Sequence, residues 1–123
     1  MEDQLKLLQS LPNLTSLSLH DGYRGEQLHI EGRSFQKLKE LRFRSLGGLN
    51  RLIIDEGALP FLELLEIAEC PQLKEVPSGI HHLKILKTLY FRDMPTEFVL
   101  SLQPDEGPDF GKVKHIPSCH FPV

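Results

Sequence analysis

Histidine and cysteine are the side chains of this chain that are best suited to bind a metal ion. The sequence contains six His and two Cys residues. His115, Cys119 and His120 lie close together near the C-terminus, but they do not have the spacing of a zinc site. The adjacent His81 and His82 cannot both face one ion from a regular element. We therefore predict surface histidines near turns and no bound metal, and a search for a metal would begin at the three C-terminal residues.

Phosphate binding is the second chemistry that the sequence could suggest. The segment Gly107-x-x-x-Gly111-Lys112-Val113 is the closest approach to a phosphate-binding loop. It has three residues between its glycines instead of four, and it has Val where the motif has Ser or Thr. The segment therefore predicts a surface turn, and we expect no cofactor.

Length, charge and hydropathy exclude several classes of protein. The 123 residues and 14.1 kDa correspond to one domain. A net charge of -3 and a pI near 6.0 argue against a nucleic-acid partner. No apolar run is long enough to span a membrane, and the first residues do not form a signal peptide. Two cysteines without a CxxC pair fit a reducing compartment, so we expect a cytoplasmic protein.

The elements that position all of these side chains follow from an internal repeat of 24 residues. Four segments begin at Leu11, Phe35, Leu59 and Leu83, and each has apolar residues at offsets 3, 6 and 8. All of these framework positions are Leu, Ile or Phe. The offset residues are Leu14, Leu17, Leu19, Leu38, Leu41, Phe43, Leu62, Leu65, Ile67, Leu86, Leu89 and Phe91.

This pattern predicts a solenoid of the α/β class. Alternation around offsets 6 and 8 indicates a short strand in each coil, with its apolar side chains pointing inward. Stacked coils place these strands in a parallel sheet on the concave face, with residues 24 apart in sequence side by side. Further apolar residues, such as Leu28, Ile30, Leu52 and Ile54, return the chain along the convex side, where we expect loops or short helices. A smooth sheet lacks the pocket that a nucleophile, a base and an acid require, so we expect no catalytic residue.

The ends of the array depart from the repeat. Residues 1–10 resemble the end of a preceding repeat, residues 11–93 hold the four repeats, and residues 94–123 form an irregular C-terminal cap and tail. A stretch rich in Pro, Gly and acidic residues at 103–108 predicts a loop. The alternating apolar residues at 113–117 predict a last strand that covers the C-terminal core. The edge before Leu11 has no cap in this sequence and could pair with another copy.

The repeat resembles the leucine-rich repeat, and the third copy fits best, with Leu62, Leu65, Ile67, Cys70 and Leu73 in the motif. The residue at offset 11 from the start of each repeat is Asn or Cys in the family. Here it holds Gly22, Leu46, Cys70 and Met94, so only Cys70 matches, as a buried ladder thiol.

The third and fourth repeats and the tail are similar to the C-terminal region of plant disease-resistance proteins of the coiled-coil, nucleotide-binding, leucine-rich repeat family. The resemblance rests on Pro71-x-Leu73-x-x-Val76-Pro77-x-Gly79-Ile80, on Met94-Pro95-x-Glu97-Phe98, and on His115-Ile116-Pro117. It implies part of an immune receptor that recognises a pathogen protein or a guarded host protein and that holds the receptor's nucleotide-binding domain inactive. It also implies that the switch chemistry belongs to domains outside this chain. A structural cap of a longer solenoid and a stand-alone scaffold or adaptor are the alternatives.

Outward side chains of the predicted strands form the candidate binding surface. The strand positions between the inward leucines hold Ser16, Glu40, Leu64 and Thr88, then Ser18, Arg42, Glu66 and Tyr90, then His20, Arg44, Ala68 and Arg92. Tyr and Arg are enriched among residues that dominate protein interfaces. We predict that the contact set is Arg42, Arg44, Leu64, Glu66, Tyr90 and Arg92. For Arg42 and Glu66, a pair across neighbouring strands that only keeps the surface soluble is an equal alternative.

Overall fold

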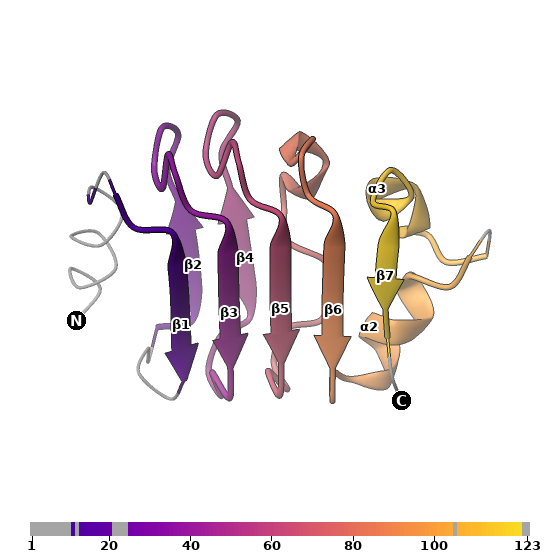
Figure 1. Cartoon of the computed structure of the whole chain (residues 1–123). Coiled ribbons are helices and arrows are strands. Elements are labelled where there is room, and N and C mark those ends of the chain that lie inside the picture. The colour runs from indigo at the N-terminus through magenta and orange to yellow at the C-terminus, as the bar shows by residue number, and fades with distance from the viewer. Residues whose placement is uncertain (1–10, 12, 21–24, 105, 122–123) are drawn as a thin grey trace.

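The computed structural model describes residues 11, 13–20, 25–104 and 106–121 as a solenoid with two parallel sheets. The larger sheet has the strand order β1-β3-β5-β6-β7 (Figure 1). The smaller sheet, of β2 and β4, lies behind β1 and β3 in the same view. The five strands of the large sheet are β1 (Ser16–His20), β3 (Glu40–Arg44), β5 (Leu64–Ala68), β6 (Thr88–Arg92) and β7 (Ser118–His120). The predicted leucine-rich repeat solenoid is confirmed.

The register of the large sheet follows the 24-residue period. Leu17 pairs with Leu41, Leu41 with Leu65, and Leu65 with Leu89. These residues are buried from β3 onwards, and Phe43, Ile67 and Phe91 form the next row of the core. Because side chains alternate along a strand, the residues between them face outward in neighbouring rows. The sequence therefore predicted both the core and the composition of the concave face.

A sharp corner recurs at the end of each of the three central strands. Ser45, Glu69 and Asp93 have φ values of 56, 55 and 55°, and they lie 24 residues apart. Residues other than Gly seldom occupy this left-handed region, which costs of order 1 kcal/mol or more each. Hydrogen bonds between neighbouring coils offset this cost. The Ser45 N–H donates to the carbonyl of Ala68, and the Glu69 N–H donates to the carbonyl of Arg92. The corners therefore link each coil to the next.

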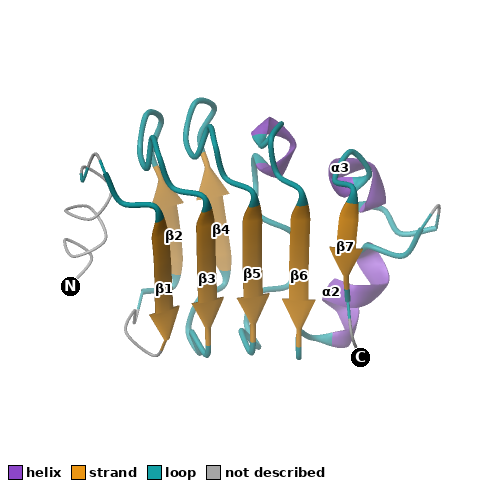
Figure 2. Ribbon diagram, in the orientation of Figure 1, coloured by secondary structure: helices purple, strands orange, loops and turns teal. Residues whose placement is uncertain are grey.

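The convex side differs from the predicted loops and short helices in the first two coils. Residues Gln27–Ile30 form β2 and residues Arg51–Ile54 form β4, and these two strands pair in parallel. Leu28 and Ile30 are fully buried and their neighbours are exposed, the pattern of a half-buried strand. Alternation in these four residues was the signal for a strand on the convex side (Figure 2).

The pairing with β4 stops in the third coil after one bridge. Ser78 pairs with Ile53 through its N–H, which donates to Leu52, and its carbonyl, which accepts from Ile54, while the Ile80 N–H turns back to Pro77. The short 3-10 helix η1 (Ile80–His82) follows instead of a strand. Gly79 makes the turn between them at φ 88°, and a Cβ there would overlap the carbonyl oxygen of Ile54. The chain can cross β4 this closely only at glycine.

The C-terminal segment covers the open end of the core. Helix α2 (Thr96–Ser101) buries Phe98, helix α3 (Phe110–Val113) buries Val113, and β7 pairs with β6. The prediction of a last strand at 113–117 was right that a strand covers this end of the core and wrong about its position. Val113 ends a helix and Ile116 enters the core through a turn, so the strand begins at Ser118. Residues 1–10, assigned to a preceding repeat, lie outside the described residues.

An exposed ion pair on the convex side gives the fold a dependence on pH. His29 Nε2 lies 2.8 Å from Asp55 Oδ1, and the Gly32 N–H donates to Asp55 Oδ2 at 3.3 Å. The hydrogen bond with His29 is the main cause that lowers the pKa of Asp55 below its usual 3.8. A lowered carboxyl pKa stabilises the fold above the unfolded-state pKa, and this stabilisation is lost as the pH falls through the folded-state pKa.

We therefore expect Asp55→Asn to lower Tm slightly at pH 6, with a smaller difference from the wild type at about pH 3, below the normal carboxyl pKa, where the stabilisation declines. Thermal unfolding followed by circular dichroism at both pH values checks this. Glu56→Gln, in the same loop, is the control and should leave Tm unchanged at both. An equal difference for Asp55→Asn at both pH values would contradict the role of the carboxylate.

Candidate protein-binding surface

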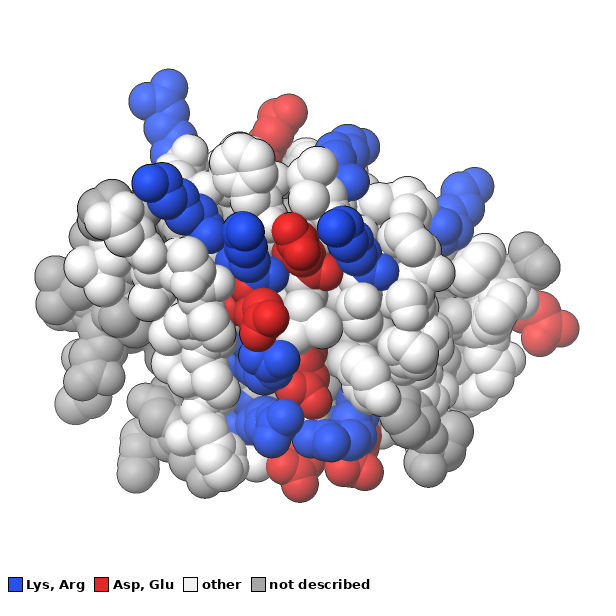
Figure 3. Space-filling model, in the orientation of Figure 1, with Lys and Arg blue, Asp and Glu red and all other residues white. Residues whose placement is uncertain are grey.

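Charged side chains gather on the concave face, over β3, β5 and β6 (Figure 3). The register brings the six predicted contact residues into one area of three adjacent strands. Arg42 pairs in register with Glu66, and Glu66 with Tyr90; Arg44, Ala68 and Arg92 form the next outward row. Leu64 begins β5 between Glu40 and Thr88 and is half-buried. The residues lie together as the period predicted, while their binding role stays a prediction.

Glu66 is the centre of this area and is itself almost inaccessible. Its side chain is 9% exposed and accepts a hydrogen bond from Arg44 Nη2 at 2.9 Å. Arg42 Nε lies 3.4 Å from the same carboxylate oxygen, and Arg92 Nη2 lies 3.5 Å from the other. A buried carboxylate is stable only when it is paired in this way. Glu66 is thus placed to hold the arginines, and it offers little surface to a partner.

The three arginines remain available to a partner. The exposed fractions of their side chains are 32% for Arg42, 39% for Arg44 and 42% for Arg92. Arg42 also donates from Nη1 to Glu40 Oε1 at 2.9 Å. Arg44 Nε is buried and has no hydrogen-bond partner in the described part of the chain. Together they form the arginine cluster, which we define as Arg42, Arg44, Arg92 and the carboxylates of Glu40 and Glu66.

An aromatic pair borders the arginine cluster on the side of the cap. The ring of Tyr90 stacks on His120, with centroids 4.8 Å apart and planes 24° apart. Ser118 Oγ lies 2.7 Å from His120 Nε2. The sequence did not reveal His120 as part of this surface, because β7 lies outside the 24-residue period. A signal was present in the alternation of Ser118, Cys119 and His120, whose outer members share one face.

The histidines were predicted at the surface near turns and Cys70 was predicted to be buried. Both predictions hold for His81, His115 and Cys70, whereas His120 lies at the surface in strand β7. His81, His115 and His120 are exposed, and Cys70 is fully buried with its Sγ donating to the carbonyl of Ala68 at 3.4 Å. Burial raises the pKa of both Cys70 and Cys119. A protonated thiol is a poor nucleophile and a poor metal ligand. Within the described ranges, no three His, Cys, Asp or Glu side chains come close enough to hold a metal ion.

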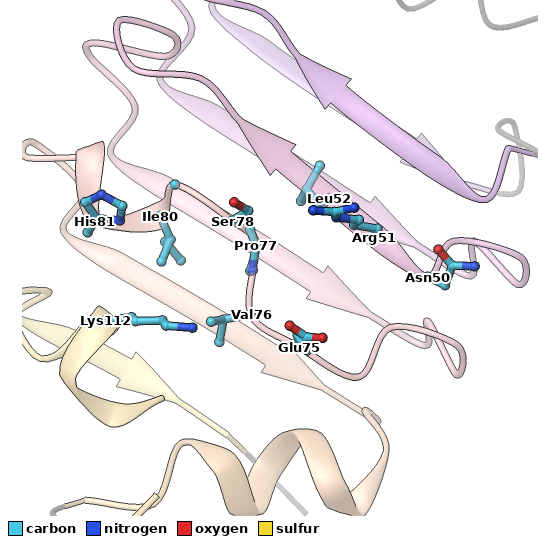
Figure 4. A pocket seen from close by; sticks show the side chains of 11 residues that line it. Asn50, Arg51, Leu52, Glu75, Val76, Pro77, Ser78, Ile80, His81 and Lys112 are labelled. Atoms are coloured by element: carbon cyan, nitrogen blue, oxygen red, sulfur yellow. The ribbon is translucent and has the colours of Figure 1, made fainter. Parts of the chain in front are cut away.

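A cavity of about 420 Å³ lies beside β4, where the convex sheet ends (Figure 4). Arg51 stands on one wall, Glu75 and Val76 on the other, and Lys112 of α3 reaches in from the cap. The sequence did not predict this cavity, because it forms where the third coil departs from the repeat. Its polar side chains are exposed, and Lys112 already pairs with Asp109 at 2.9 Å.

No described helix is long and apolar enough to cross a bilayer. No protein-family model matches the chain, and no solved structure matches it. Curated proteins of Arabidopsis thaliana do match. The chain is 35% identical over 121 residues to the probable disease resistance RPP8-like protein 4 of this plant. The aligned region covers 98% of this chain and 13% of that protein.

Two further relatives have comparable similarity. The identity is 33% over 121 residues to disease resistance protein RPH8A of Arabidopsis thaliana, covering 98% of this chain and 13% of the relative. It is 32% over 117 residues to disease resistance protein RPM1 of the same plant, covering 95% and 12%. The chain thus spans about 13% of the length of the curated relatives it matches. The family resemblance inferred from the repeats is confirmed, and this chain is a leucine-rich repeat segment homologous to part of the plant disease resistance proteins.

Proposed function

We propose that this chain is a protein-recognition segment of a plant intracellular immune receptor, acting in the cytoplasm and without catalysis. Its partner is a pathogen effector or a guarded host protein. The observation that carries the proposal is the concave face, where a rigid parallel sheet presents Tyr90, Leu64 and the half-exposed arginines in one area. Tyr and Arg are enriched among the residues that dominate protein interfaces, and the relatives are disease resistance proteins.

A second role, as the end cap of a longer solenoid, has its own supporting observation. β7 adds a strand to β6, and Phe98 packs edge-on against Phe91 with ring centroids 4.6 Å apart. The cap would close the repeat array and contribute to autoinhibition of a nucleotide-binding domain in a parent receptor. Self-association through the edge before β1 stays a prediction, since residues 1–10 and 12 lie outside the described residues; light scattering of the purified chain measures it.

The recognition role is tested by capture of proteins from host and pathogen extracts on the immobilised chain. Tyr90→Ala is expected to weaken a specific interaction by about tenfold or more, because a hot-spot aromatic contributes roughly 2 kcal/mol. Phe61→Ala is the matched control, since Phe61 is an aromatic residue, 57% exposed, outside the concave strands. Capture that is unaffected by Tyr90→Ala and by Leu64→Ala would show that recognition does not use the concave face.

A further inference from the structure

The arginine cluster contains one more positive charge than negative charge. Three guanidinium groups share the carboxylates of Glu66 and Glu40. Glu69 and Asp93 follow the strand ends, but neither lies within ion-pair distance of an arginine in the described part of the chain, and Glu69 Oε1 accepts from the Ser45 hydroxyl. Within the arginine cluster, the excess positive charge therefore lies at Arg44 and Arg92, which share the single ion-paired carboxylate of Glu66.

Ala68 allows these two arginines to converge. It stands between Arg44 and Arg92 in the outward row, so their backbones are two strand spacings, about 9–10 Å, apart. Both nevertheless reach Glu66, and Ala68 is fully buried although its row faces outward. A larger side chain at this position would lie between the two guanidinium groups.

Hydrogen-bond donors remain unused at this point. A guanidinium has five N–H groups. Arg44 donates one of them to Glu66 through Nη2, and Arg92 Nη2 lies 3.5 Å from Glu66 as an ion pair, while Arg44 Nε is buried without a partner among the described residues. A carboxylate binds an arginine best through two parallel N–H bonds, and such pairs are among the strongest hydrogen bonds in proteins. The acceptor that best suits the exposed N–H groups of Arg44 and Arg92 is therefore an anion with two oxygens.

We propose that the gap between Arg44 and Arg92 binds a side-chain carboxylate of the partner protein, and that Glu66 and Ala68 are positioning residues for it. This inference rests on the proposed recognition function and specifies its chemistry. Glu69 and Asp93 at the strand ends repel an acidic group, so the carboxylate enters from the side of Tyr90 and His120. The partner thus carries an acidic side chain beside a group that packs on the aromatic pair.

The test is a calorimetric titration of the 123-residue chain with a short oligoglutamate peptide, with oligoglutamine and oligolysine peptides as controls. We expect binding of oligoglutamate only, weakened by added salt. The double variant Arg44→Gln/Arg92→Gln should weaken binding roughly 10- to 100-fold, because hydrogen bonds to a charged group are lost. Arg33→Gln/Arg51→Gln removes the same charge outside the concave sheet and should leave the affinity within about twofold of the wild type.

Glu66→Gln separates positioning from simple attraction. Removing a negative charge should tighten oligoglutamate binding if only net charge matters, whereas loss of the anchor that holds the arginines should weaken it several-fold. Ala68→Leu should also weaken binding with no change in charge. Circular dichroism confirms that each variant is folded.

Equal binding of the three peptides, or tighter binding by Glu66→Gln, would overturn the inference. An equal effect of the two double arginine variants would also overturn it. The recognition function is tested separately, because capture that is sensitive to Tyr90→Ala can persist when oligoglutamate does not bind.

Discussion

A chain that ends at Asp93 is expected to lose its folded, monomeric state. The cap buries Phe98, Leu102, Val113 and Ile116, whose exposures are between 0 and 5%. Burial of one such side chain contributes about 1.5–3 kcal/mol, so four of them contribute an amount comparable to the whole stability of a domain, about 5–15 kcal/mol. Truncation also removes β7 from the edge of β6 and exposes Phe91. The expected result is aggregation or unfolding, measured by light scattering and circular dichroism.

Two point substitutions in the cap provide the matched comparison. Phe98→Ser should reproduce much of the loss, because Phe98 is fully buried in α2. Leu100→Ser lies two residues away in the same helix, where Leu100 is 52% exposed, and should leave the protein folded. A folded, monomeric chain of residues 1–93 would show that the repeats are stable without the cap.

Phe43→Ala is expected to lower the free energy of unfolding by about 3–5 kcal/mol, the range found when a buried Phe is truncated. Phe43 is fully buried and lies between Leu19 and Ile67 of the neighbouring strands, so the cavity would open between coils. The stability of a solenoid is approximately the sum of its repeats and of the interfaces between neighbouring repeats. The free energy lost at this interface should therefore appear in the unfolding of the array.

Phe61→Ala is the control for this substitution and should change the free energy by less than about 0.5 kcal/mol, as surface substitutions do. Phe61 is 57% exposed. Urea denaturation followed by circular dichroism measures both values. Similar losses for the two variants would contradict the assignment of the core.

The parts of the fold that follow the period could be predicted from the sequence. Leu41, Leu65 and Leu89 fix the inward row, and the outward neighbours of these residues follow from the pleat of a strand. The burial of Glu66 could not be predicted, because it depends on where three long arginine side chains end. The period predicted that residues 24 apart lie side by side. Arg44 instead reaches Glu66 diagonally across the two strands, and these residues are 22 apart in sequence.

The cap and the convex side were predicted less well, for different physical reasons. β7 follows β6 by 30 residues, with Thr88 paired to Ser118, so no periodic signal marks it. On the convex side, β4 has only four residues, and short apolar alternation is weak evidence for a strand. That sheet ends at Gly79, where the chain turns at φ 88° and the Ile80 N–H donates to the carbonyl of Pro77 instead of to β4.

The constant 24-residue register also determines which changes in length this protein can inherit. Loss or duplication of one whole coil by unequal recombination keeps every strand pair of β1, β3, β5 and β6 in place. An insertion or deletion of one residue inside a strand would turn the leucines beyond it to the outside. The concave face can therefore vary by substitution at outward positions and by exchange of complete coils, while the rows of leucines stay in register.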